Sequence, residues 1–442
     1  MELVAGGVFC IVILLFLLAL GMQIGLAFVL SGFVASVLIL GLDSSVSLLG
    51  LSAYFSVATP TWAAIPLFIL MGAFASRGGL ARRAYEGVHA LSRRVPGSLM
   101  VATCFSSGVF GAVSGSSIAT AAIFGRMALP EMHRLRYDKV LSVGCIASAG
   151  TFASMIPPSM MMIIYALFTQ QSIGRLFAAG ILPGLLTAVA YAVLIVALVK
   201  RNPALAPDDV TPSPGDAPVR KRDAAMRMWP VAIIGVVVLG GIYSGWLTPT
   251  EAAAAGALVT LGLGWILGEY QRISQVTEPM KESANITAML FLINIGALFY
   301  SRVLAVTGLP GELVGMLQYW NLPPFAVLTG IMLVMFLLGM IMVPVGIYAL
   351  TLPIVFPVLV NLGYDPIWFG VIALKLTEIG AITPPVGLNV FAIKGAIPKE
   401  IEVSTEQIYK GCIPFLLVDV AVLILLVAFP QIVLWLPDLL LG

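Results

Sequence analysis

Four clusters of glycine, proline and hydroxyl residues interrupt a sequence that is otherwise strongly apolar. Two lie in the first half of the chain, at residues 111–117 and 150–159, and two in the second half, at residues 339–344 and 377–389. The clusters at 150–159 and 377–389 each contain a double proline, which removes two amide donors and pushes the preceding residue away from helix. Carbonyl groups upstream then lose their helical partners. In lipid such groups cost several kcal/mol each unless something binds them.

A small hard cation would satisfy these carbonyls together with the neighbouring hydroxyl oxygens, in a shell that needs no fixed charge. The alternative is packing: serine and threonine hydroxyls bond back to their own helix, and glycines let helices approach closely, as the GxxxG spacing of Gly111 and Gly115 allows. Packing is favoured for any one serine taken alone, whereas four clusters matched between the two halves favour ion binding.

Ionisable side chains within apolar segments are the other candidates for chemistry. Lys375 and Glu378 are three residues apart, so on a helix they share a face and could pair. Such a pair is either structural or part of an ion or substrate site. Asp419 and Glu251 lie near segment ends and are interpreted as structural. The sequence has no HExxH and no GxxxxGK[ST] motif, so energy for any pumping must come from an ion gradient or another subunit.

The composition shows that lipid is the main solvent of this chain. Hydrophobic residues occupy 60% of the 442 positions, charged residues 10%, and the mean hydropathy is +1.06. Soluble proteins average about 25% charged residues, because their surface must face water. The net charge of +2 argues against a nucleic-acid partner. The four cysteines have no CxxC spacing, which argues against a disulfide or zinc site.

The apolar runs predict a protein that crosses the membrane many times. A spanning helix needs about 20 apolar residues. Spanning segments are predicted at residues 3–20, 22–42, 62–76, 97–113, 139–156, 177–199, 229–246, 250–268, 284–306, 324–342, 366–382 and 411–437. Shorter, interrupted pieces lie at 114–130, 157–172, 344–362 and 383–397. We expect re-entrant hairpins there, which are tolerated only when buried in protein or lining a cavity. The N-terminal run is interpreted as retained helices, not a signal peptide.

Two basic stretches, residues 76–96 and 200–227, predict the topology. The positive-inside rule places both in the cytoplasm, and since three crossings precede residue 76, the N-terminus is expected outside. Apolar residues recur every three or four positions in the first stretch, which predicts an amphipathic helix lying in the membrane interface. The second stretch has four prolines between 203 and 214 and is composed like a flexible linker.

The linker separates two halves that resemble each other. Residues that match at an offset of 227 are Pro130 and Pro357, Tyr137 and Tyr364, Asp138 and Asp365, Pro157 and Pro384, and Pro158 and Pro385. At an offset of 231 the matches are Gly180 and Gly411, Pro183 and Pro414, and Leu185 and Leu416. The predicted parts are therefore residues 1–200, a cytoplasmic linker at 201–227, and residues 228–442. Repeats that each contain a broken segment indicate a transporter's binding site; whether they are inverted depends on the number of crossings between them.

Three long blocks of the sequence resemble the large membrane subunit of tripartite ATP-independent periplasmic (TRAP) transporters, the DctM-like family. They are FGAVSGSSIATAAIFGRMALPEM (110–132), the run from Tyr137 through IPPSMMMIIYALFTQQSIGRLFAAGILPG (156–184), and GYDPIWFGVIALKLTEIGAITPPVGLNVFAIKG (363–395). The resemblance implies an all-α polytopic protein of the bacterial inner membrane, with two pseudo-symmetric repeats, re-entrant hairpins and broken helices, of the ion-transporter-superfamily elevator type. It also implies sodium symport of a small organic acid, without another cofactor. The implied partners are a small four-helix membrane subunit and a periplasmic substrate-binding protein.

Carried over to these positions, the resemblance predicts two sodium sites. The first comprises Ser114, Ser116, Ser117, Gly150, Ile156 and Pro157; the second comprises Gly339, Thr377, Gly380, Thr383 and Pro384. Substrate contacts are predicted at Ser116, Ser159, Thr383 and Asn389. The sequence departs from the family at one place. Members often have Met-Asp-Gly where this chain has Met342, Val343 and Pro344, so the carboxylate of the second hairpin is missing.

Three other functions are alternatives to a TRAP transporter permease. A stand-alone sodium-coupled carboxylate carrier of the wider superfamily would lack the small subunit and the binding protein. A membrane-embedded enzyme would need convergent acid, base or nucleophile groups, which only Lys375 and Glu378 approximate, so no enzymatic activity is expected. A passive channel is disfavoured, because paired broken segments are typical of alternating access.

Overall fold

The computed structural model of the protein describes residues 2–207, 221–398 and 400–441. These residues form helices and connecting turns, and no β-strand occurs among them. The predicted all-α fold class is therefore confirmed. Residues 208–220, the centre of the predicted linker, lie outside the described residues. On either side of them, α10 ends at Arg201 and α11 begins at Lys221.

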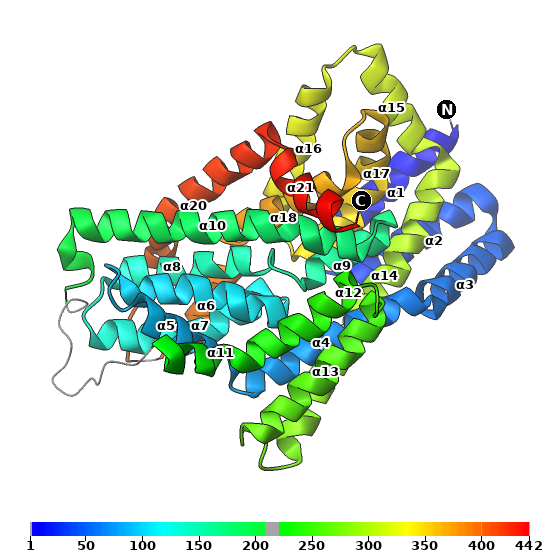
Figure 1. Cartoon of the computed structure of the whole chain (residues 1–442). Helices are drawn as coiled ribbons and strands as arrows, with labels where there is room; N and C mark the ends of the chain where they lie inside the picture. Colours follow the sequence, from blue (N-terminus) through cyan, green and yellow to red (C-terminus); the bar gives the residue numbers. More distant parts are fainter. Residues whose placement is uncertain (1, 208–220, 399, 442) are drawn as a thin grey trace.

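A first group of helices is organised around α14 (Ser274–Thr307), which packs against α1, α2, α3 and α4. In turn, α13 packs along α4. Figure 1 shows the N-terminus and α1 to α3 at one end of the molecule, beside α14. The bounds of the other helices in this group are α1 Glu2–Ala19, α2 Ile24–Leu40, α3 Leu42–Ala58, α4 Ala64–Arg77 and α13 Pro249–Ile266.

A second group consists of two runs of five helices in the same order. Each run has two helices joined by a tight turn, two helices separated by a broken segment, and one long helix. The first run comprises α6 Ser98–Ser114, α7 Ser117–Arg134, α8 Lys139–Ala153, α9 Met160–Thr169 and α10 Ile173–Arg201. The second run comprises α16 Pro324–Gly339, α17 Pro344–Asn361, α18 Pro366–Gly380, α19 Leu388–Ala396 and α20 Thr405–Ala428.

Residues matched between the halves have the same local function in both runs. Asp138 is the N-cap of α8 and accepts a hydrogen bond from the amide of Leu141 at 2.7 Å. Asp365 is the N-cap of α18 and accepts from the amide of Ile367 at 2.8 Å. Both satisfy amides that a helix start leaves without partners. The matched double prolines 157–158 and 384–385 each contain a cis peptide bond.

The two runs pack against each other crosswise. The helix α8 contacts α20, and its counterpart α18 contacts α10; likewise α7 contacts α19, and α17 contacts α9. The α8–α20 contact depends on two glycines that come together from opposite runs. A Cβ atom on Gly144 would lie only 2.0 Å from the carbonyl carbon of Gly411, so a larger residue at this position would push the helices apart.

The remaining helices connect or cover these groups. They are η1 Pro60–Ala63, α5 Leu80–Ser92, η2 Pro203–Leu205, α11 Lys221–Gly235, the π-helical η3 Val236–Gly240, α12 Gly241–Tyr243, α15 Leu309–Tyr319 and α21 Gln431–Leu441. The basic stretch at 76–96 forms the predicted amphipathic helix α5. Its residues Leu80, Ala84 and Val88 are buried, and the helix packs against α6 and α11. Leu91, predicted on the same face, is 51% exposed.

Several predicted segments have different bounds in the structure. The helices α3 and α15 were not predicted, because α3 carries many serines and α15 is short. The predicted span 411–437 is two helices, α20 and α21, interrupted at Phe429 and Pro430. Among the described residues five helices, or six with the bent pair of α3 and η1–α4, are long and apolar enough to cross a membrane, against twelve predicted spans. One of the five is α17, which the sequence predicted as a short, interrupted piece.

The two ends of α14 define the two sides of the molecule. Its first turns are held by Arg77, which pairs with Glu278 and lies 3.8 Å from Glu282. Arg77 belongs to the basic stretch that we assign to the cytoplasm. The 34 residues of α14 extend about 50 Å at 1.5 Å per residue, more than the roughly 30 Å of a bilayer core. We therefore expect the following helix α15 on the periplasmic side.

This sidedness predicts opposite accessibility at two exposed positions. In intact cells, Arg94→Cys should resist a membrane-impermeant thiol reagent, whereas Tyr319→Cys, at a residue that is 88% exposed, should react. The four native cysteines are buried and provide a low background. Labelling of the cysteine at 94 from outside, or protection of the one at 319, would contradict the assigned sides.

Candidate functional site

The first candidate site lies where the turn between α6 and α7 meets the break between α8 and α9. A Cβ atom on Gly115 would lie 3.1 Å from the amide nitrogen of Met160. A Cβ atom on Gly150 would lie 2.8 Å from the carbonyl oxygen of Ser117. The structure thus brings together the two stretches of the first predicted sodium site, residues 114–117 and 150–157. Of these residues, Ser117, Gly150 and Pro157 are buried and Ile156 is half-buried.

The second candidate site repeats this arrangement in the second run. The turn between α16 and α17 meets the break between α18 and α19, and a Cβ atom on Gly380 would lie 2.4 Å from the carbonyl carbon of Gly339. The amides of Val386 and Gly387 donate to the carbonyl of Met340 at 3.2 and 3.3 Å. Gly339 therefore lies against Thr377 and Gly380, as predicted, while Thr383 is half-buried and Pro384 is exposed.

Each site gathers helix ends of both polarities. In the first, α6 and α8 end while α7 and α9 begin; in the second, α16 and α18 end while α17 and α19 begin. The last carbonyls of a helix have no intrahelical partner and carry partial negative charge, which favours a cation. The first amides carry partial positive charge, which favours an anion. The same break can therefore hold a cation and face an anionic group.

Several hydroxyl groups in the clusters already have local partners. Ser116 caps α7 by accepting from the amide of Ala119 at 3.3 Å, and Ser159 caps α9. Thr377 donates to the carbonyl of Leu374 at 2.9 Å, and Thr383 donates to that of Ile379 at 2.7 Å. These bonds match the packing interpretation, but each oxygen keeps a lone pair that could bind a cation.

The predicted substrate residues do not all lie in the same break. Ser116 and Ser159 border the first break, and Thr383 lies in the second. Asn389 follows the second break in sequence, yet its side chain reaches the first one. Its amide nitrogen would lie 3.3 Å from a Cβ atom on Gly150, and its Oδ1 is buried without a hydrogen-bond partner. Asn389 therefore contributes to the first site from the second run.

The predicted pair between Lys375 and Glu378 is wrong. Lys375 Nζ instead lies 2.6 Å from Asp419 Oδ1 and donates to Thr187 Oγ1 at 3.2 Å. The other oxygen of Asp419 accepts from the hydroxyl of Tyr191 at 2.6 Å. Packing of α10 and α20 on α18 supplies these partners, and sequence spacing along one helix could not show them. The sequence had placed Asp419 near a segment end. In the structure it is fully buried in the middle of α20.

Glu251 has the structural function that the sequence predicted. Its carboxylate accepts from the amide of Thr248 at 2.8 Å, and Thr248 in turn caps the start of α13. This is a capping box, which satisfies two amides at the helix start. Val343 is the N-cap of α17 and Pro344 is its first residue. Proline suits that position because the missing amide would have had no partner there.

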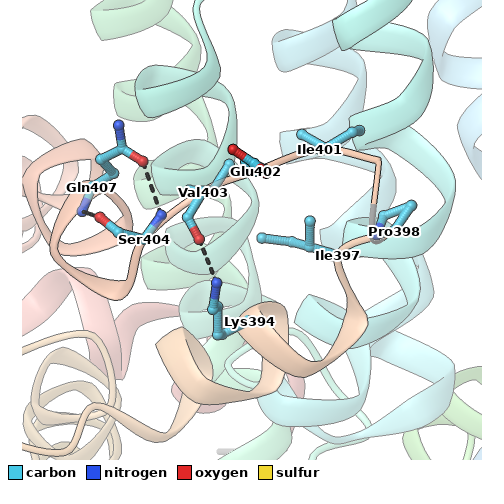
Figure 2. A pocket seen from close by; sticks show the side chains of 8 residues that line it. All are labelled: Lys394, Ile397, Pro398, Ile401, Glu402, Val403, Ser404 and Gln407. Atoms are coloured by element: carbon cyan, nitrogen blue, oxygen red, sulfur yellow. Dashed lines mark hydrogen bonds between the residues drawn. The ribbon is translucent and has the colours of Figure 1, made fainter.

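Two of the cavities outside the paired breaks have several polar side chains in their walls. One of about 630 Å³ borders the connection between α19 and α20. Figure 2 shows that its polar side chains support that connection: Lys394 donates to the carbonyl of Val403 at 2.5 Å, and Ser404 and Gln407 cap α20. The other cavity, of about 440 Å³, is lined by Thr59, Trp62, Gln170, Gln171 and Arg302, among others. It lies toward the C-terminal end of α14, where Arg302 provides a positive charge.

Two runs of helices with paired interruptions, in an apolar all-helical chain, define a polytopic membrane protein of the transporter class. Residues 11–432 match the family described as "Tripartite ATP-independent periplasmic transporter, DctM component". The chain belongs to this family of TRAP transporter large permeases. It is accordingly an inner-membrane protein that crosses the membrane several times.

Individual relatives agree with this assignment. The chain is 35% identical over 380 residues to the C4-dicarboxylate TRAP transporter large permease protein of Pseudomonas aeruginosa, covering 86% of each chain. It is 30% identical over 388 residues to the sialic acid TRAP transporter large permease protein of Vibrio cholerae, covering 86% of this chain and 87% of the other. Its fold resembles the Alcanivorax borkumensis YdaH transporter, with a TM-score of 0.64 at 14% identity, over 89% of this chain and 90% of that one.

The buried pair of Lys375 and Asp419 yields a stability prediction. Lys375→Met should lower the free energy of unfolding by about 3–5 kcal/mol, because it leaves the carboxylate of Asp419 buried without a countercharge. Adding Asp419→Asn should recover most of this loss, since the amide is neutral and can still bond Tyr191. The measurement is thermal or denaturant unfolding of the purified chain in detergent.

A matched control is Arg134→Met, which removes an exposed ion pair with Glu131. Exposed pairs contribute about 0–1 kcal/mol, so this variant should unfold close to the wild type. If Lys375→Met also unfolds like the wild type, or the double variant is no better than the single one, the pair does not stabilise the core in this way.

Proposed function

We propose that the chain is the permease subunit of a sodium-driven TRAP transporter that takes up a small organic acid. A periplasmic binding protein delivers the substrate, and a small four-helix membrane subunit completes the transporter. One observation carries this proposal: a hairpin turn meets a broken helix in the same order of elements, once in each half of the chain.

The cation is assigned to the helix ends at the two breaks. Carbonyl oxygens at the ends of α6, α8, α16 and α18, together with nearby hydroxyls, are oxygen ligands that suit a hard cation such as sodium. The proposed ligands are Ser114, Ser116, Ser117, Gly150, Ile156 and Pro157 in the first site, and Gly339, Thr377, Gly380, Thr383 and Pro384 in the second. Among the described residues, no three His, Cys, Asp or Glu side chains gather into a group that could hold a metal ion.

The substrate is assigned as a carboxylate. The starts of α7, α9, α17 and α19 present amide donors and positive partial charge to the same breaks. Ser116, Ser159, Thr383 and Asn389 supply further polar groups around them. Relatives are named for C4-dicarboxylates and for sialic acid, which both carry carboxylate groups. Arg302, in the cavity toward the periplasmic end of α14, would attract such an anion.

The two runs are assigned as pseudo-symmetric repeats of opposite orientation. The first hairpin follows the basic stretch on the cytoplasmic side, whereas the second follows α15 on the periplasmic side. Crosswise packing of α8 on α20 and of α18 on α10 unites the repeats into one body. In an elevator cycle this body would move relative to the group around α14 and carry substrate and ions across.

The sodium gradient is assigned as the energy source, because the sequence contains no P-loop. Moving one net charge through 100 mV provides about 2.3 kcal/mol, enough for roughly a fortyfold substrate gradient. Two sodium ions with a monocarboxylate would move one such charge. The runner-up, a stand-alone carboxylate carrier, is distinguished by the absence of genes for a small membrane subunit and a binding protein beside this one.

The sodium assignment predicts the effect of two hydroxyl deletions. Ser116→Ala and Thr383→Ala should each raise the sodium concentration for half-maximal uptake several-fold, because each removes one ligand among several. Uptake of the cognate carboxylate is measured in liposomes that contain all three components. Both variants should fold, since each deleted hydroxyl makes only a local hydrogen bond.

Thr329→Ala serves as the matched control, because the hydroxyl of Thr329 also bonds back to its own helix but is exposed and lies outside both breaks. It should retain the wild-type sodium dependence. If Ser116→Ala and Thr383→Ala fold and behave like Thr329→Ala, the hydroxyls in the clusters serve packing alone and the site assignment fails.

A further inference from the structure

Glu378 is a carboxylate that the assigned sodium ligands do not include. It lies on α18 and is 1% exposed. Both of its carboxylate oxygens are buried, and neither accepts a hydrogen bond from the residues that the structure describes. Buried carboxylates in proteins are normally paired or hydrogen-bonded, because an isolated buried charge is very costly. A group in this position therefore needs a partner.

The lysine one turn earlier on α18 cannot serve as that partner. Lys375 is already paired with Asp419 at 2.6 Å, and this carboxylate neutralises it. The three buried ionisable side chains Lys375, Asp419 and Glu378 together carry one positive and two negative charges when ionised. One negative charge remains without compensation inside the protein, so one additional positive charge would make the group neutral.

The surroundings of Glu378 belong to the first break, although Glu378 itself belongs to the second run. Ser154 and Ser117 lie close to its carboxyl group, and α18 packs against α8 and α9, the two helices that flank this break. Ser154 follows α8 directly, and Ser117 begins α7. The carbonyl of Ser117 in turn lies beside Gly150. A second buried oxygen without a partner is Oδ1 of Asn389, a residue whose amide nitrogen would lie 3.3 Å from a Cβ atom on Gly150.

We propose that the Glu378 carboxylate is an anionic ligand of the cation in the first site, supplied by the second run. This proposal rests on the sodium coupling proposed above. The sequence predicted a cation shell of neutral carbonyl and hydroxyl oxygens, whereas the shell proposed here also contains a negatively charged carboxylate. A monovalent ion makes the buried group neutral, whereas a divalent ion would leave a surplus charge. The occupant is therefore a monovalent hard cation.

The proposal explains how occupancy of the first site acts on both runs. The cation bridges carbonyls and hydroxyls of α6 to α9 and a carboxylate on α18, so its release leaves an uncompensated charge between the two runs. A site without its ion is then costly to move through the membrane. This cost gives a physical reason why movement of the site depends on bound sodium, which neutral ligands alone would not give.

The test is sodium-dependent stability of the purified full-length chain in detergent. Thermal unfolding is followed while sodium chloride replaces choline chloride at constant ionic strength, because a ligand that binds only the folded state stabilises it by RT ln(1 + L/Kd), where L is the free ligand concentration. Sodium should stabilise the wild type. Glu378→Gln should be at least as stable as the wild type without sodium, and the sodium concentration that gives a fixed increase in stability should rise at least about tenfold, the scale of losing a supporting group in a metal site.

Glu131→Gln, at an exposed carboxylate that pairs with Arg134, is the control and should titrate like the wild type. If Glu378 is instead a neutral, protonated side chain, glutamine replaces it closely and Glu378→Gln also titrates like the wild type; this result overturns the proposal and leaves sodium coupling intact. If the wild type itself gains no stability from sodium, both proposals fail.

A second variant covers the case in which Glu378→Gln does not fold. Glu378→Asp keeps the negative charge but shortens the side chain by one methylene group, which moves the carboxylate away from the proposed cation. It should still be stabilised by sodium, with a weaker apparent affinity than the wild type. A sodium titration of Glu378→Asp that coincides with that of the wild type contradicts a direct ligand role for this carboxylate.

Discussion

A helix that is interrupted within a membrane leaves backbone groups that water cannot reach, and the rest of this structure depends on how they are satisfied. The chain places its four interruptions in pairs, so that each hairpin turn meets a broken helix. Direct hydrogen bonds satisfy part of each site, as where Met340 accepts from Val386 and Gly387. Helix ends of opposite polarity provide the remainder, and they attract a cation and an anion to the same place. In the proposed function, interruption and ion binding are thus two aspects of one constraint.

The same constraint governs the buried charges. The ammonium group of Lys375 is stable in the core because it pairs with Asp419 and donates to Thr187. The hydroxyl of Tyr191 donates to the other oxygen of Asp419. These partners come from α10 and α20, the long helices that end the two runs. The pair therefore holds α18 against both long helices. Glu378 has no such arrangement among the described residues, and this contrast within one helical turn is the basis for proposing that Lys375 is structural and Glu378 functional.

The sequence predicts the interruptions well, because proline and glycine act locally. Asp138 and Asp365 cap corresponding helices, and the double prolines lie in corresponding breaks, as the offset of 227 indicated. The sequence predicts contacts between distant residues poorly. Spacing on one helix favoured Lys375 with Glu378, while the actual partner of Lys375 is 44 residues away. The presence of Asn389 and Glu378 at the first break also depends on crosswise packing of the runs, which no local pattern encodes. The serine-rich helix α3 was missed because its composition resembles a loop.

The central claim is that a sodium gradient alone drives carboxylate uptake through this permease. The most direct measurement uses liposomes that contain the chain with its small membrane subunit, supplied with loaded binding protein and no nucleotide. An inward sodium gradient should make the substrate accumulate inside, and equal sodium on both sides at zero membrane potential should abolish accumulation. Omitting either partner should reduce uptake to background. Accumulation that is independent of sodium, or robust sodium-driven uptake by the single chain, would contradict the account.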